Sequence, residues 1–185
     1  SACLSTSPTM IYFGQHVGEP GDGNMGFGSE TRTSIFDYCG VPAHQRWMNN
    51  GKFDGGQLTE GEKELNNFYK TLLNFTTQSL ALTGEFAEIH TYNRENTPGY
   101  TDKLFSFVRW SNDEKLLIIS NFEESPHEFQ LKIDAETIKK LNLKNGSYKL
   151  TDQLSGKEGM KLVINESGFV DIKLAALESL IVEIL

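Results

Sequence analysis

The side chains best suited to binding a ligand lie in a glycine-rich stretch between residues 15 and 58. Trp47 offers an aromatic face, and Arg32 and Asp37 offer planar hydrogen-bonding groups. An aromatic face combined with such groups is typical of a sugar-binding site. The alternative is structural: Trp47 packs the stretch down, and Arg32 pairs with Asp37. The stretch has few periodic apolar residues, and a loop of this length in a compact domain usually has a function.

Metal and cofactor chemistry is not expected from the other residues. The four histidines have no metal-ligand spacing, and Cys3 and Cys39 are too far apart for a zinc motif. The residues Asp22-Gly23-Asn24 are similar to part of a calcium loop, but Asp and Asn beside Gly are also ordinary turn formers. No nucleophile elbow or phosphate-binding glycine motif is present. We therefore expect neither a metal nor a cofactor.

The charge balance excludes two classes of partner. The chain has 185 residues, with 25 acidic against 17 basic side chains and a net charge of −8. No cluster of Lys and Arg forms a stripe, so neither nucleic acid nor an anionic membrane is expected to bind. No apolar run approaches the roughly 20 residues that span a bilayer. Residues 1–9 show no secretory signal, and the compartment is left open between cytoplasmic and extracytoplasmic.

Two elements are expected before residue 83. The apolar run Thr9–Gly14 predicts a strand buried on both faces, as in a parallel barrel. Thr59 and Glu62 have the spacing of a capping box, which predicts the start of a helix. Leu65, Phe68 and Leu72 then recur at helical spacing and give that helix one apolar face.

After Gly84 the pattern changes to short apolar runs separated by turn residues. Alternation of apolar and polar residues predicts strands with one buried face, and many such strands indicate an antiparallel sandwich. The expected strands are 85–90, 104–110, 115–122, 127–133, 147–151, 160–165, 169–174 and 179–185. A short helical turn is expected within 134–142. The predicted fold class is therefore mainly β, with domains at 1–82 and 83–185.

In this order, the motifs resemble those of the α-amylase family, glycoside hydrolase family thirteen. The segment from Pro8 to Gly18 is similar to the last strand of that family's (β/α)8 barrel, with His16 where glutamate is usual. Residues 65–73 look like its last barrel helix. Landmarks of its C-terminal β-sandwich are matched by Phe107, Arg109, Asn121, Phe122 and the run 152–156. The resemblance covers nearly the whole chain.

The resemblance implies a C-terminal portion of an α-glucan hydrolase or transglycosidase that acts on starch-like glucans. Residues 1–82 would be the last strand, long loop and last helix of the catalytic barrel, and 83–185 the complete sandwich. Retaining glycosidases need two carboxyl groups about 5–5.5 Å apart. The family's catalytic carboxylates lie on earlier strands, so the resemblance implies no catalytic residue in this chain. Arg32, Asp37 and Trp47 would then be substrate-binding candidates in the long loop, because barrel active sites lie on such loops.

Two further expectations follow from the residues. The alternative function is a carbohydrate-binding β-sandwich, which would need Tyr92, Tyr100 and Trp110 to form an exposed, flat platform.

The strand Thr9–Gly14 would lack its barrel neighbours and expose two apolar edges. We therefore expect either that residues 1–58 are mobile or that the chain forms a homodimer through this strand.

Overall fold

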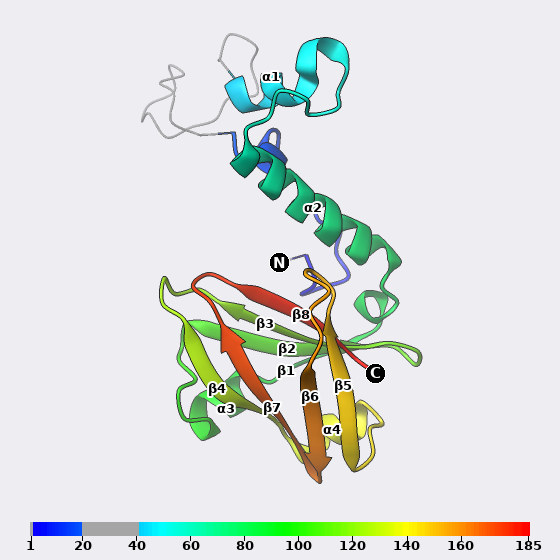
Figure 1. Cartoon of the computed structure of the whole chain (residues 1–185). Helices are drawn as coiled ribbons and strands as arrows, with labels where there is room; N and C mark the ends of the chain where they lie inside the picture. The colour runs from blue at the N-terminus through cyan, green and yellow to red at the C-terminus, as the bar shows by residue number, and fades with distance from the viewer. Residues whose placement is uncertain (1, 20–40) are drawn as a thin grey trace. The chain divides into compact units, whose positions relative to one another are not determined.

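The computed structural model describes residues 2–19 and 41–185 (Figure 1). These described residues divide into two compact units, one of residues 8–19 with 41–74 and one of residues 2–7 with 75–185. The first, here called the loop unit, contains helical segments and, among its described residues, no strand. The second, the sheet unit, holds all eight strands. The domain boundary at residues 82 and 83, defined by resemblance, stays a prediction.

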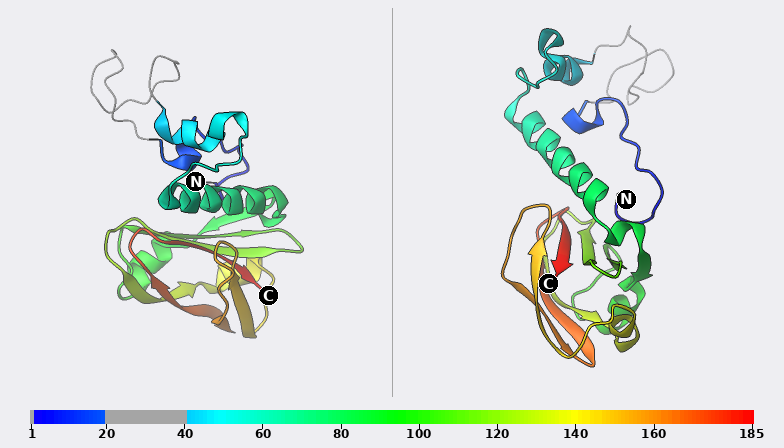
Figure 2. Two further views of the ribbon diagram at one scale, coloured as in Figure 1. Left: turned by 45° about the horizontal axis from the view of Figure 1, so that its top comes forward. Right: turned by 90° about the vertical axis from the view of Figure 1, so that its right-hand side faces the viewer.

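The sheet unit is a single antiparallel sheet with strand order β1-β2-β3-β8-β5-β6-β7-β4. The sheet curls so that β1, β2, β3 and β8 face β5, β6, β7 and β4, as Figure 2 shows. The strands are β1 Glu85–Glu88, β2 Leu104–Trp110, β3 Lys115–Asn121, β4 His127–Ile133, β5 Gly146–Asp152, β6 Met160–Asn165, β7 Ser167–Leu174 and β8 Ser179–Ile184. The predicted mainly β, antiparallel architecture is confirmed.

One apolar core lies between the two halves of the sheet. It takes alternate residues from every strand after β1, because successive side chains of a strand point to opposite faces. Val108, Ile119 and Val182 come from one half, and Leu131 and Ile172 from the other; all are fully buried. In β4 and β7 the alternation in the sequence therefore identified the core face of the strand.

The outer face of β2, β3 and β8 is also buried, and a charged side chain lies within it. Arg109 is only 1% exposed. Its guanidinium donates hydrogen bonds to the carbonyl oxygens of Leu82, Gly84 and Cys3. Burial lowers the pKa of Arg109. Arg109 thereby attaches the first residues of the chain, and the segment that precedes β1, to the sheet.

The edge of β4 is closed by a side chain instead of a strand. Asn93 lies in α3 (His90–Asn96) and is fully buried. Its amide donates to the Lys132 carbonyl and accepts from the Lys132 N–H, each at 2.8 Å. It also donates to the Ile89 carbonyl at 2.8 Å and accepts from the Thr97 hydroxyl at 2.7 Å. The Asn93 side chain therefore bonds to β4 as a neighbouring strand would, which satisfies backbone groups of an edge strand.

The longest helix follows a local signal. The helix α2 (Glu60–Gln78) begins with the predicted capping box: the Thr59 N–H donates to Glu62 at 2.9 Å, and the Glu62 N–H donates to the Thr59 hydroxyl at 3.4 Å. The Gln15 amide donates to the Tyr69 hydroxyl at 2.8 Å and so connects η1 (Gln15–Val17) to this helix. The remaining helical segments are α1 Pro42–Met48, η2 Asn49–Gly51, η3 Ala81–Thr83 and α4 Ala135–Lys140.

The expected strand over Thr9–Gly14 is wrong. No strand is assigned there, and Met10 is 87% exposed. A strand is stable only when another strand takes its backbone hydrogen bonds. Here the Tyr12 N–H donates to the Gln15 side chain, and the Gln15 N–H donates to the Tyr12 carbonyl, so the chain turns. Self-association through this segment stays a prediction.

Among the described residues, no helix is both long and apolar enough to cross a membrane.

Candidate functional site

Trp47 lies on a short helix that the sequence analysis did not predict. The helix α1 begins with Pro42, whose fixed φ suits the first turn. It ends at Asn49 in the left-handed conformation, φ 44°, where the Asn49 N–H donates to the Gln45 carbonyl. With only seven residues, α1 has no apolar periodicity that would have revealed it. It directs Trp47 towards the small core formed by Val17, Ala43 and Leu58.

Around Trp47 the chain gathers two histidines and two phenylalanines. The Trp47 ring centroid is 5.3 Å from that of His16, 5.5 Å from His44 and 5.8 Å from Phe53. Phe13 lies 4.3 Å from His44. The side chain of Trp47 is half-buried, so most of its ring packs against this cluster. This is the packing role considered as the alternative; a substrate-binding role for Trp47 stays a prediction.

The two histidines of the cluster are the feature that sequence reasoning missed. They are 28 residues apart, and their ring centroids are 6.1 Å apart. Burial, and secondarily the nearby His44, lowers the pKa of His16, which favours its neutral form. No short-range motif could have placed these rings together. In the described part of the chain, no three histidine, cysteine or acidic side chains group as they would around a metal.

Three carboxylates among the described residues of the loop unit have structural partners. Glu62 forms an ion pair with Arg46 while it caps α2. Asp54 accepts from the Asn49 amide at 2.7 Å and from the Gly56 N–H at 2.9 Å. Glu19 accepts from the His44 N–H at 2.9 Å. These contacts give each of the three carboxylates a role in holding the loop.

The loop unit should lose stability in acid through Glu62. The hydrogen bond from Arg46 lowers the pKa of Glu62 from 4.5 to about 2. A carboxyl group with a lowered folded-state pKa stabilises the fold above its unfolded pKa, and this contribution disappears as the pH falls through the folded value. The expected loss therefore lies between about pH 4.5 and pH 2. Tryptophan fluorescence in a Trp110→Phe background reports on Trp47 alone and measures it.

Two variants test this prediction. Glu62→Gln should weaken the loop unit at pH 7 and flatten the fluorescence change between pH 4.5 and pH 2. Glu60→Gln is the matched control, because Glu60 is an exposed residue of the same turn and forms a surface ion pair with Lys63. An unchanged acid transition in Glu62→Gln would show that the ion pair with Arg46 does not hold the unit.

Arg32, Asp37 and the calcium-like Asp22-Gly23-Asn24 lie outside the described residues.

The aromatic platform that the alternative function would need on the sandwich is not formed. Tyr100 is only 7% exposed. Its hydroxyl lies 2.9 Å from the Ser106 hydroxyl and 3.2 Å from His90 Nδ1, and its ring packs edge-on against Phe129. Burial raises the pKa of Tyr100 to about 12. A flat surface made of Tyr92, Tyr100 and Trp110 is therefore excluded, because the middle ring belongs to the core.

The polar landmarks of the sandwich are buried supports. Besides Arg109, Asn121 is 2% exposed and donates to the carbonyls of Ser125 and Ala175, both at 2.8 Å. Asp152, also 2% exposed, accepts from the N–H groups of Ser155 and Ile181. Each landmark residue fixes turns or segments next to the strands. These hydrogen bonds explain why Arg, Asn and Asp stand at these positions, and the role of each side chain is structural.

Comparison with known proteins supports the fold. No family model matches the sequence, and no curated protein does. The chain shares its fold with solved structures of α-amylase-family glycoside hydrolases, as its sequence motifs predict.

Three of these structures match almost the whole chain. A variant of AmyP in complex with maltotriose matches 99% of it, with a TM-score of 0.60 and 17% identity, over 33% of its own chain. AmyP in complex with maltose matches 98% of this chain, with a TM-score of 0.59 and 16% identity, over 32% of its own chain. The maltogenic α-amylase AmyB from Thermotoga neapolitana matches 100% of this chain, with a TM-score of 0.61 and 13% identity, over 35% of its own chain. The chain thus spans about a third of the length of these structures.

Proposed function

We propose that the chain is the C-terminal part of an α-amylase-like glycoside hydrolase acting on α-glucosidic bonds of starch-like glucans. The observation that carries the proposal is the match of 98–100% of this chain to about a third of each α-amylase structure. The motifs around Tyr12-Phe13-Gly14-Gln15 and the buried landmarks Arg109, Asn121 and Asp152 occur in the order that the family has. The α-glucan substrate would be bound by the longer protein.

In this proposal the chain is structural and does no chemistry alone. Glycoside hydrolysis needs an acid and a nucleophile, or a base, on opposite sides of one glycosidic bond. The carboxylates Glu19, Asp54 and Glu62 are hydrogen-bonded within the loop unit, and Asp152 is buried in the sheet unit. The sheet unit would have a supporting role in the longer protein; the last residues of α2, from Phe75, belong to it.

The chain by itself should release no reducing sugar from starch, maltooligosaccharides or pullulan. The reason is the missing pair of catalytic carboxyl groups. The measurement is a reducing-sugar assay on the purified chain, with a mock purification as control. Activity that elutes with the chain and is abolished by a substitution of one of its own carboxylates would overturn the non-catalytic role.

A further inference from the structure

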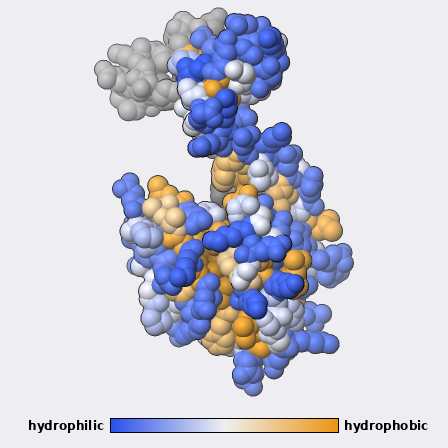
Figure 3. Space-filling model, viewed as in Figure 1, coloured by the Kyte–Doolittle hydropathy of each residue, from blue (hydrophilic) through white to orange (hydrophobic). Residues whose placement is uncertain are grey.

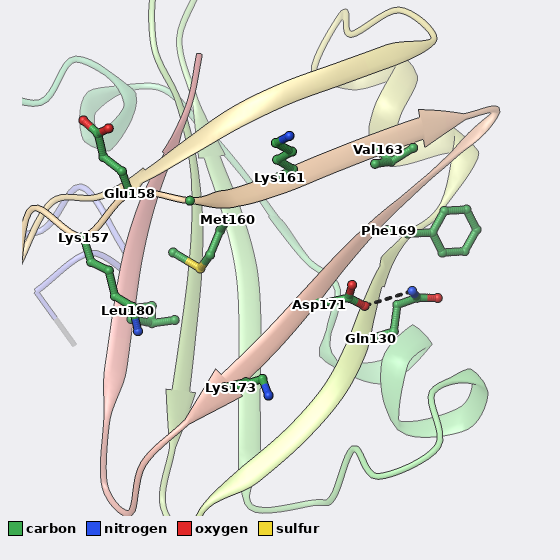
Figure 4. A pocket seen from close by; sticks show the side chains of 11 residues that line it. Gln130, Lys157, Glu158, Met160, Lys161, Val163, Phe169, Asp171, Lys173 and Leu180 are labelled. Carbon is green, nitrogen blue, oxygen red and sulfur yellow. Dashed lines mark hydrogen bonds between the residues drawn. The ribbon is translucent and has the colours of Figure 1, made fainter.

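A cleft opens in the sheet unit where two neighbouring strands separate. β6 and β7 pair over three positions only, from Val163 opposite Phe169 to Asn165 opposite Ser167. Beyond them β6 continues back to Met160 and β7 runs on to Leu174 with no pairing between the two strands. The gap forms a cleft of about 890 Å³. Figure 4 shows the strands diverging around it.

The cleft has an apolar floor and a polar rim. Met160 and Leu180 line the floor, where the gap reaches the core between the sheets. In Figure 3, apolar residues are visible in the hollow between β7 and β6, with hydrophilic ones around them. Val163, 49% exposed, and the half-buried ring of Phe169 lie side by side on the outer face. A mostly apolar concave surface with few polar groups is the usual form of a small-molecule site.

Two planar polar groups are held next to the aromatic ring. The Gln130 amide donates to Asp171 at 3.0 Å, between β4 and β7 (Figure 4). Asp171 follows Phe169 by two residues on the same face of β7, about 7 Å along the strand. A carboxylate has about four acceptor positions, so Asp171 keeps capacity for hydroxyl donors while it is bound to Gln130. The ring and the planar pair are thus placed about one sugar ring apart.

The charges of the cleft favour a neutral ligand. Lys157, Lys161 and Lys173 are offset by Glu158 and Asp171. Lys173 in addition pairs with Glu128 at 2.7 Å. A phosphate or nucleic-acid site would need a clear excess of positive charge. A polyhydroxylated neutral molecule instead needs an apolar face and hydrogen-bonding groups, and the cleft offers both.

We propose that the rim of this cleft on the outer face of β7 and β4, where Phe169, Asp171 and Gln130 lie (Figure 4), is an accessory site for a short α-glucan, distinct from any catalytic centre. One sugar ring stacks on Phe169, and its hydroxyls bind Asp171 and Gln130. The choice of α-glucan among neutral oligosaccharides rests on the proposed function. The alternative occupant is an extended peptide, which would add a strand to the unpaired edges of β6 and β7.

The test is a titration of the ¹⁵N-labelled chain with maltoheptaose, followed by amide chemical shifts. Shifts should concentrate on β4, β6 and β7 around Gln130, Lys161 and Asp171. Phe169→Ala should weaken binding by about tenfold or more, the scale of losing one aromatic contact. Phe86→Ala is the matched control, because that ring is 42% exposed and lies on β1. If Phe169→Ala does not fold, Phe169→Leu removes the ring and keeps most of the apolar volume.

Three results would overturn the proposal. They are no shifts at millimolar maltoheptaose, equal binding by wild type and Phe169→Ala, and equal binding of cellohexaose, a β-linked glucan. Shifts along β6 and β7 with an extended peptide but not with maltoheptaose would assign the cleft to strand addition. None of these results bears on hydrolysis by the longer protein, which is measured separately, so failure here leaves the proposed function standing.

Discussion

Asn93→Asp is expected to lower the free energy of unfolding of the sheet unit by about 3–5 kcal/mol, the scale of an uncompensated buried charge. The substitution changes one group and keeps the size of the side chain. The Asn93 amide donates to the carbonyls of Ile89 and Lys132, and its oxygen accepts from the Lys132 N–H. A carboxylate cannot donate, so it would face two carbonyl oxygens in a site that is 0% exposed.

Urea unfolding followed by far-UV circular dichroism measures this change. The loss should be smaller at acidic pH, because a protonated aspartic acid regains one donor and sheds its charge. Asn96→Asp is the matched control: Asn96 is an exposed residue of the same helix, and its amide donates to the Tyr92 carbonyl within that helix. A loss below about 1 kcal/mol in Asn93→Asp would mean that the β4 edge does not depend on this amide.

Asp152→Asn is the converse substitution, with an expected loss of about 2–4 kcal/mol. Both oxygens of Asp152 accept: one from the N–H and hydroxyl of Ser155, the other from the Ile181 N–H at 3.0 Å. An amide must turn an NH₂ group towards one of these donors. Hydrogen bonds to a charged acceptor are worth about 1.5–3 kcal/mol each, and a buried donor left unpaired costs about 1–3 kcal/mol.

The same unfolding measurement applies, with Asp113→Asn as control. Asp113 is exposed in the turn between β2 and β3, where Asn is equally suited. Equal midpoints for Asp152→Asn and wild type would show that the turn after β5 is held by its backbone alone. It would also show that the Asp152 carboxylate is not needed for stability.

Local patterns in the sequence were enough to predict most of the sheet unit. β2, β4 and β6 begin and end at the predicted residues, and the other strands differ by one or two residues at one end or, for β5, at both ends. Ile118 shows why: it stands in an apolar run between turn residues, and it is 4% exposed. Strand alternation and the capping box of Thr59 and Glu62 are properties of neighbouring residues, which a sequence displays directly.

Features that depend on distant partners could not be predicted in this way. α3 is polar throughout and has no apolar stripe; it is held by Asn93, which contacts Lys132, 39 residues away. The cluster of Trp47 with His16 and His44 likewise joins separate segments. Thr9–Gly14 carries the composition of a buried strand, but no neighbouring strand is present among the described residues to pair with it. The cleft between β6 and β7 depends on where pairing stops.

The most direct measurement of the central claim compares two proteins in one assay of sugar release from starch and maltooligosaccharides. One is the 185-residue chain, and the other is the gene product extended upstream of Ser1 to include the proposed catalytic barrel. We expect release by the extended protein and none by the chain alone. Release by the chain alone, or an extended protein that is folded but cleaves no α-glucan, would contradict it.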